Sequence, residues 1–176
     1  LSKIDSGAMK LNKMRFDIVE AIFRTIISFE QKIEDKQLDI RGAEEMEAFF
    51  VDGDPDLLGQ VIYNLFENAV KFVNVGGYIE LQTYENKGYA HFRIRNSGAG
   101  VEPDELKLLF ERFYKTDRSR SLDKTGIGLG LYIVKTIVTL HGGDITARSV
   151  VGEYCEFEFS IPVISGTTEL SLLDRK

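Results

Sequence analysis

The chain has 176 residues, of which 43% are hydrophobic and 28% are charged, a composition typical of one soluble globular domain with or without an appendage. Its formal net charge of −6 argues against non-specific binding of nucleic acid, because such binding depends on basic surfaces that release counterions. A single cysteine excludes an internal disulfide and a cysteine-built metal site, and no apolar run approaches the roughly 18 residues of a membrane span.

The N-terminal third of the chain predicts a helix end, a longer helix and two strands. Residues 1–12 have the pattern of a helix end that is broken near a glycine. Residues 15–36 begin with a short extended piece and continue as an amphipathic helix, because apolar residues recur there at helical spacing. Residues 37–42 and 47–53 are short and rich in strand-forming residues. The first residue is leucine, and we expect the chain to be a piece of a longer protein.

The next predicted element is a helix over residues 54–72, which opens with an aspartate as N-cap and a proline at the first helical position. Most of its apolar side chains share one face. Asn64, Asn68 and Lys71 lie at i, i+4 and i+7, so they form a separate polar stripe. An amide oxygen can bind Mg²⁺ and a lysine can meet a phosphate, but an ordinary solvated helix face has the same pattern.

The C-terminal half predicts strands in adjacent pairs. Residues 77–98 have the pattern of a β-hairpin, residues 102–113 that of a short capped helix, and residues 114–125 that of a polar loop. Residues 144–162 form a second hairpin-like pair, and the tail from Val163 has no clear signal. Paired strands favour an α+β fold, with helices on one face of an antiparallel or mixed sheet, over a doubly wound parallel sheet.

Three alternating glycines, Gly126, Gly128 and Gly130, precede an apolar helical pattern that ends at His141. Glycines this dense weaken a helix or strand, so something must come close to this backbone. Two explanations remain open from this segment alone: a helix start that packs against the sheet, and a helix N-terminus whose free N–H groups bind phosphate. The segment matches neither a dinucleotide-binding loop, which follows a strand directly, nor a P-loop, which ends in Gly-Lys-Ser/Thr.

Four segments, taken in order, resemble the N, G1, F and G2 boxes of the catalytic, ATP-binding domain of sensor histidine kinases. They are NLFENAVKF (64–72), NSGAGV (96–101), LFERFYK (109–115) and GIGLGLYIVK (126–135). The resemblance implies the fold shared with gyrase- and Hsp90-type ATPases: a two-layer sandwich of a mixed sheet and three helices, with ATP between two helices and a flexible lid. It also implies a remnant of the dimerisation helix and linker at 1–13, a catalytic domain at 14–163 and a tail at 164–176.

The resemblance assigns roles to individual residues. Asn68 would bind Mg²⁺, and Asn64, Lys71 and Arg112 would be catalytic residues near the metal and the triphosphate. The residues implied to bind the nucleotide are Asn68, Asn96, Gly98, Gly100, Lys115, Thr125, Gly126, Ile127, Gly128, Leu129 and Gly130. Phosphoryl transfer needs mainly positioning and charge neutralisation, and this set supplies both.

Three departures from the family pattern stand in the sequence. Asn96 replaces the usual aspartate of the G1 box, so a neutral amide oxygen would accept from the adenine amino group, a bond about half as strong as a charge-assisted one. Tyr154 and Cys155 occupy the later positions of the usual Gly-x-Gly-Thr ending, where we expect a packing adjustment. The box around the phospho-accepting histidine is absent, and His91 and His141 lie in a predicted strand and at a predicted helix end.

The resemblance therefore implies the catalytic domain of a two-component sensor kinase. It would bind Mg-ATP and donate the γ-phosphoryl group to a histidine on a dimerisation helix absent from this chain, for relay to an aspartate of a response regulator. The parent would be a homodimer, with this domain in the cytoplasm and no nucleic-acid partner. Two alternatives remain: a regulatory nucleotide-binding module with weak catalysis, and a non-kinase ATPase of the same fold. Such ATPases usually carry a carboxylate base near Asn64, where the sequence offers only Glu67, one turn away.

Overall fold

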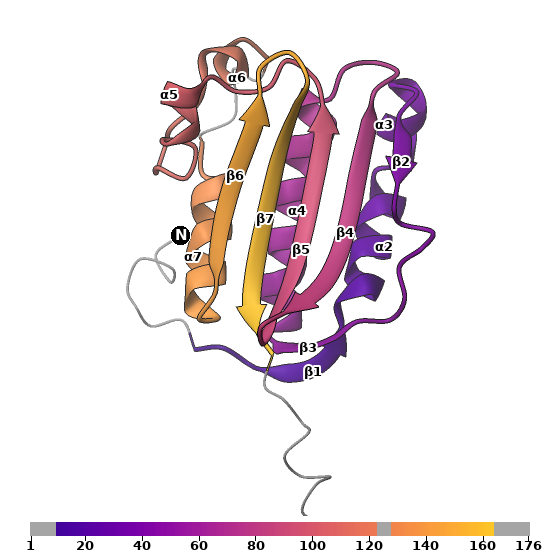
Figure 1. Cartoon of the computed structure of the whole chain (residues 1–176), viewed down its shortest axis with the longest axis vertical. Helices are drawn as coiled ribbons and strands as arrows, with labels where there is room; N and C mark the ends of the chain where they lie inside the picture. The colour runs from indigo at the N-terminus through magenta and orange to yellow at the C-terminus, as the bar shows by residue number, and fades with distance from the viewer. Residues whose placement is uncertain (1–9, 123–127, 164–176) are drawn as a thin grey trace, which may run out of the picture.

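The computed structural model describes residues 10–122 and 128–163, within which the strands form one large and one small sheet (Figure 1). The large sheet has five strands in the order β2-β4-β5-β7-β6. The bounds are β2 Asp39–Arg41, β4 Tyr78–Asn86, β5 Tyr89–Ser97, β6 Asp144–Val150 and β7 Tyr154–Pro162. Neighbouring strands are antiparallel except β2 and β4, which run parallel, so the sheet is mixed and mostly antiparallel.

Three helices cover one face of this sheet and leave the other face open (Figure 1). They are α2 Ile18–Ser28, α4 Pro55–Phe72 and α7 Gly130–Leu140, and α4 packs against both of the others. The small sheet pairs β1 Met14–Asp17 with β3 Phe50–Gly53 in antiparallel register. The predicted α+β fold, a mixed sheet backed by three helices, is confirmed.

The hydrophobic core lies between the sheet and the three helices. Phe92 of β5 and Phe159 of β7 are fully buried, and their ring centroids lie 5.4 Å apart. Leu65 and Phe66 of α4 are buried to the same degree on the opposite side of this layer. Each such side chain contributes about 1.5–3 kcal/mol to stability by leaving water. The core therefore holds α4 firmly against the centre of the sheet, which positions the polar stripe of that helix.

Helix α4 begins where the sequence predicts. Asp54 is its N-cap, and the carboxylate accepts hydrogen bonds from the backbone N–H groups of Asp56 and Leu57. Pro55 occupies the first helical position, where the N–H that it lacks would have no helical partner. The prediction of this helix over residues 54–72 is confirmed.

The prediction of one continuous helix within residues 15–36 is wrong, because the helix is interrupted at Phe29. The extended start is β1, the first helix is α2, and a second helix, α3, spans Glu30–Asp35. Phe29 leaves helical geometry, and its buried ring lies 5.2 Å from Tyr63 and 5.3 Å from Phe66, between ring centroids. Packing of this ring against α4 accounts for the break.

Two predictions around the middle of the chain are also corrected. The helix predicted over residues 102–113 is only the four-residue α5, Pro103–Leu106, and the side chain of its N-cap residue makes no capping hydrogen bond. The loop predicted over residues 114–125 contains a helix, α6 Asp117–Leu122. Thr116 starts α6, because its hydroxyl accepts from the Ser119 N–H at 3.0 Å. No apolar periodicity follows this cap, so local patterns in the sequence do not predict the helix.

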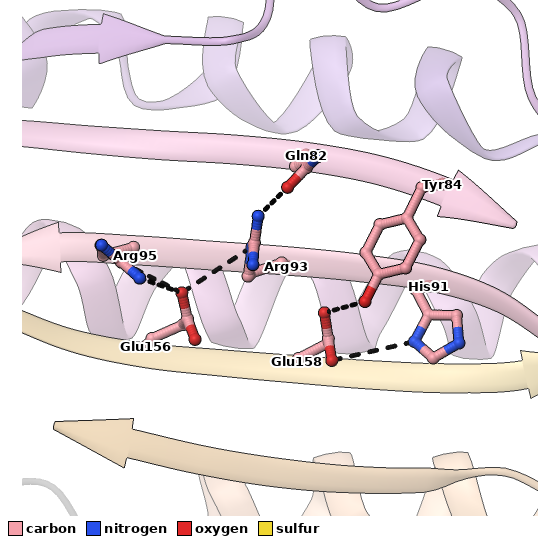
Figure 2. A network of polar contacts seen from close by, with 7 residues as sticks. All are labelled: Gln82, Tyr84, His91, Arg93, Arg95, Glu156 and Glu158. Atoms are coloured by element: carbon pink, nitrogen blue, oxygen red, sulfur yellow. Dashed lines mark hydrogen bonds and ion pairs between the residues drawn. The ribbon is translucent and has the colours of Figure 1, made fainter. Parts of the chain in front are cut away.

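Figure 2 shows a polar network on the open face of the sheet, formed by Gln82, Tyr84, His91, Arg93, Arg95, Glu156 and Glu158. Glu156 is only 4% exposed although it carries a charge. One of its oxygens lies 2.9 Å from Arg95 Nη2 and 3.7 Å from Arg93 Nε. Buried charges are tolerated only when they are paired, so these two arginines make the buried carboxylate possible and join β5 to β7.

The expected division into residues 1–13, 14–163 and 164–176 stays a prediction, since residues 1–9 and 164–176 lie outside the described part of the chain. Within the described part, every helix is too short or too polar to cross a membrane.

Candidate functional site

A cavity of about 300 Å³ lies among α4, the start of α7, the ends of β5 and β7, and the segment that carries α5 and α6. Most of the residues predicted to form the site line it. These residues are Asn64, Asn68, Lys71, Asn96, Gly100, Lys115, Gly128, Leu129 and Gly130. The structure thus brings together four segments that are far apart in the sequence.

Helix α4 supplies the polar stripe along one wall. Asn64 donates from its side-chain nitrogen to the Gly130 carbonyl oxygen at 3.3 Å, and its side-chain oxygen accepts from Gln60 at 3.2 Å. Its amide therefore ties α4 to the start of α7. Asn68 lies one turn further along the same wall, and Lys71 follows almost a turn later. The stripe is thus part of the cavity wall and not merely a solvated helix face.

Strands β5 and β7 form the inner end of the cavity. Asn96 is 4% exposed, and its side-chain nitrogen donates to the Ser97 carbonyl oxygen at 3.0 Å, which leaves its side-chain oxygen available as an acceptor. Cys155 is the register partner of Asn96 on β7 and also lines the cavity. Burial raises the pKa of Cys155 to about 12, so the thiol is neutral at physiological pH. This end is therefore a neutral surface with one polar acceptor.

The segment that carries α5 and α6 forms the opposite wall. One oxygen of Glu105 accepts from the Asp117 N–H at 3.1 Å and from the Tyr114 hydroxyl at 3.4 Å. Burial and the neighbouring Glu105 carboxylate raise the pKa of Tyr114. Lys115 and Arg118 also line the cavity. Glu105 thus holds the first turn of α6 against α5, and this segment brings two cations to the cavity, Lys115 before α6 and Arg118 within it.

Two of the predicted glycines have different surroundings. Gly128 has φ +72°, and a Cβ there would lie 2.8 Å from the Tyr114 carbonyl oxygen, so close packing of two backbone segments requires glycine. Gly130 has no neighbour within 4 Å of a Cβ position and lines the cavity. Packing explains the first glycine, and the open space beside the second is consistent with approach of a ligand. Thr125, Gly126 and Ile127, also predicted for the site, lie outside the described residues.

Two predicted site residues lie beside the cavity without lining it. The guanidinium of Arg112 lies over the rings of Phe113 and Tyr132, 5.3 Å and 5.5 Å from their centroids. Gly98 packs against the end of α4, where a Cβ would lie 2.8 Å from the Phe72 carbonyl oxygen. Their proposed roles at the nucleotide remain predictions.

Sequence reasoning missed several residues that line the cavity, among them Glu105, Leu109, Cys155 and Phe157. The strand register could have identified two of them. Cys155 and Phe157 are two positions apart on β7, so they share one face of the sheet, and Cys155 pairs with Asn96 near the end of β5. No local pattern marks Glu105, whose position depends on where α5 stops.

The chemistry of the cavity suits an anionic ligand with an aromatic part. Its described lining combines three cations, Lys71, Lys115 and Arg118, with the carboxylates of Glu67 and Glu105. Apolar side chains, among them leucine and phenylalanine, also line it. Among the described residues there is no cluster of three or more His, Cys, Asp or Glu side chains that could hold a metal ion. A divalent cation here would take an amide oxygen together with ligand oxygens and water, as Mg²⁺ commonly does.

The fold and this cavity define a class of nucleotide-binding domain, and a family model identifies it. Residues 53–165 match the family described as histidine kinase-, DNA gyrase B-, and HSP90-like ATPase. The match covers more than half of the chain, and the chain therefore belongs to this family.

Two sensor proteins show where in this family the chain falls. It is 32% identical over 164 residues to the sensor histidine kinase WalK of Bacillus subtilis (strain 168), a match of 92% of this chain and 27% of that protein. It is 30% identical over 162 residues to the sensor protein SrrB of Staphylococcus aureus (strain MRSA252), with 92% and 28% covered. The chain thus spans less than a third of the length of these relatives.

Solved structures agree with this placement. The catalytic domain of the histidine kinase ThkA, in a nucleotide-free form, has a TM-score of 0.74 and 26% identity, with 88% of this chain and 97% of that chain covered. Full-length ShkA in complex with AMPPNP has a TM-score of 0.76 at 24% identity, covering 92% and 33%, and shows likeness of fold. The chain is a histidine kinase-type ATPase domain, homologous to the catalytic domains of sensor kinases.

Proposed function

We propose that this domain binds Mg-ATP and donates the γ-phosphoryl group to a histidine on a dimerisation helix that this chain does not contain. The parent would act as a homodimer, with this domain in the cytoplasm, and would pass the phosphoryl group to an aspartate of a response regulator. One observation carries the proposal: the amide and lysine stripe of α4, the cations Lys115 and Arg118 and the buried Asn96 all line one cavity. The similarity to WalK and SrrB supports the same proposal.

Residues of α4 and of the segment that carries α6 would hold the triphosphate. Asn68 would offer its amide oxygen to Mg²⁺, which would neutralise charge on the phosphates. Lys71, Lys115 and Arg118 line the same cavity and would neutralise the charge that remains. Asn64 already bonds to Gly130, so it would position the start of α7 beside the phosphates. Each of these contributions is positioning or charge neutralisation, the two requirements of phosphoryl transfer.

Asn96 would recognise the base. Because its side-chain nitrogen donates to Ser97, its oxygen can accept from the exocyclic amino group of adenine. Phe157 and Cys155 would cover apolar surface of the base.

Replacement of Asn96 by aspartate tests this role. Asn96→Asp should retain ATP binding or strengthen it by on the order of 1 kcal/mol, because a carboxylate is the stronger acceptor. The same change removes the donor to the Ser97 carbonyl oxygen. We therefore expect Asn96→Asp to lower the thermal stability of the domain. Calorimetric titration with Mg-ATP and thermal unfolding measure the two effects. A large loss of affinity would show that Asn96 acts through its NH₂ group.

Neither histidine of the chain is placed to accept the phosphoryl group. His91 lies on the open face of the sheet, where its ring stacks on Tyr84 with centroids 4.6 Å apart (Figure 2). His141 is 4% exposed, and both of its ring nitrogens have backbone partners. Transfer requires the acceptor nitrogen within near-attack distance of the γ-phosphate, which neither ring provides.

We therefore expect the chain to bind Mg-ATP without phosphorylating itself on histidine. The experiment is incubation with γ-labelled ATP, alone and with a purified helical fragment that carries a kinase phospho-acceptor histidine, followed by a test for acid-labile, base-stable label. Label on the chain alone that disappears in His91→Gln or His141→Gln would contradict the assignment of the acceptor to another segment.

A second candidate function, ATP hydrolysis, has one observation in its favour. Glu67 lines the cavity one turn from Asn64, where a carboxylate could activate water. Release of phosphate by the isolated chain, lost in Glu67→Gln while nucleotide affinity is kept, would favour the ATPase over the kinase.

A further inference from the structure

Helices α4 and α7 form two walls of the cavity and run side by side behind the sheet (Figure 1). Two hydrogen bonds join them, one at each end of α7. Beside the cavity, Asn64 donates to the Gly130 carbonyl oxygen at 3.3 Å. At the far end, the backbone N–H of Asp54 donates to His141 Nε2 at 3.0 Å. The start of α4 is thus bonded to the end of α7 through an imidazole ring.

The surroundings of His141 require a neutral ring of one tautomer. Its Nδ1 lies 2.8 Å from the Ile137 carbonyl oxygen, which can only accept, so Nδ1 carries the proton. The Asp54 N–H can only donate, so Nε2 must be free of a proton. The ring is 4% exposed, and a Cβ at Gly53 would lie 3.2 Å from it, so the neighbouring strand leaves room for this ring.

Asp54 gathers three further groups at the same point. One carboxylate oxygen accepts from the first turn of α4, and the other accepts from the Asn12 N–H at 3.0 Å. The chain that enters the domain, the start of α4 and the end of α7 therefore meet at Asp54 and His141. We call these two residues the joint.

We propose that His141 is a positioning residue for the nucleotide cavity: by accepting the Asp54 N–H, it fixes the spacing of α4 and α7 at the end away from the cavity and so sets the width of the cavity between them. The inference rests on the proposed binding of nucleotide in this cavity. His141 does not touch the nucleotide and acts through the two helices whose residues do.

Acid should open the joint. A protonated ring would carry an N–H at Nε2 that faces the Asp54 N–H. Burial is the largest influence on the pKa of His141 and lowers it below its usual 6.5. The Ile137 carbonyl opposes this shift, the Lys13 ammonium adds to it, and the Asp54 carboxylate opposes it. The contribution of the joint to stability is therefore complete above pH 6.5 and is lost as the pH falls through the lowered pKa of the folded state.

Two replacements of His141 separate positioning from simple packing. His141→Phe keeps a ring but leaves the Asp54 N–H without an acceptor, and we expect Mg-ATP affinity of the folded protein to fall about twofold to thirtyfold. His141→Gln offers a carbonyl oxygen that cannot be protonated, so it should bind nearly as wild type. Its affinity should also decline less than that of wild type as the pH falls from about 7.5 through the range in which the wild-type ring takes up a proton. His91→Phe, the same change on the open face, is the matched control and should bind as wild type.

The measurements are calorimetric titration at low temperature, with folding of each variant verified by circular dichroism, and hydrogen exchange without nucleotide. Exchange at the first turn of α7 should be faster in His141→Phe than in wild type. Equal affinity of folded His141→Phe and wild type would overturn the inference. If His141→Phe fails to fold, identical dependence of Mg-ATP affinity on pH in His141→Gln and wild type would overturn the inference. If wild type binds no ATP, the proposed function fails, and the exchange rates alone decide the inference.

Discussion

Replacement of Asn68 by alanine should remove most of the Mg²⁺-dependent part of ATP affinity. Asn68 lies on the cavity wall formed by α4, between Asn64 and Lys71, and it would supply the protein oxygen to the metal. The described residues offer no acidic cluster as a substitute ligand, so the metal would depend on this amide, the phosphates and water. We expect affinity for Mg-ATP to fall by at least about tenfold. Calorimetric titration in Mg²⁺ measures the change.

The same titration in EDTA is the control for this prediction, because wild type and Asn68→Ala should then bind ATP with similar, weaker affinity. Asn86→Ala removes the same amide from an exposed position at the end of β4 and should bind as wild type in both conditions. Equal affinities of Asn68→Ala and wild type in Mg²⁺ would remove Asn68 from the metal site.

Local patterns predict those parts of the fold that local interactions determine. The start of α4 depends on Asp54 and Pro55, whose capping roles act within one helical turn. The hairpin of β4 and β5 follows from alternation along each strand, and the polar stripe of α4 follows from helical spacing. These elements carry Asn64, Asn68 and Asn96, and most of the predicted site residues accordingly line one cavity.

The errors lie where distant contacts decide. The amphipathic pattern is continuous at Phe29, but the helix is interrupted there because the ring packs on α4, more than thirty residues further along the chain. Helix α6 starts at the local cap of Thr116, but its place in the fold depends on Glu105, whose carboxylate accepts from the Asp117 N–H. The joint at His141 spans 87 positions between its two partners. No window of neighbouring residues contains these contacts, so periodicity and propensity could not predict them.

Gly143→Ala should strongly destabilise the domain, by on the order of 3 kcal/mol. Gly143 connects α7 to β6, and its N–H donates to the Val138 carbonyl oxygen at 3.0 Å. A Cβ there would overlap the Ser160 carbonyl oxygen and lie 2.9 Å from the carbonyl carbon. This obstacle is the backbone of β7, the neighbour of β6 in the sheet, and no flexible side chain can move aside.

Thermal unfolding measures this effect, and Gly59→Ala is the matched control. Gly59 lies inside α4 with nothing within 4 Å of a Cβ position, so alanine there should stabilise the helix by about 1 kcal/mol. At roughly 2–4 °C per kcal/mol for a chain of this size, Tm should fall by about 6–12 °C in Gly143→Ala and rise by about 2–4 °C in Gly59→Ala. A Tm of Gly143→Ala equal to that of wild type would mean that α7 and β6 can separate from β7 without loss of the core.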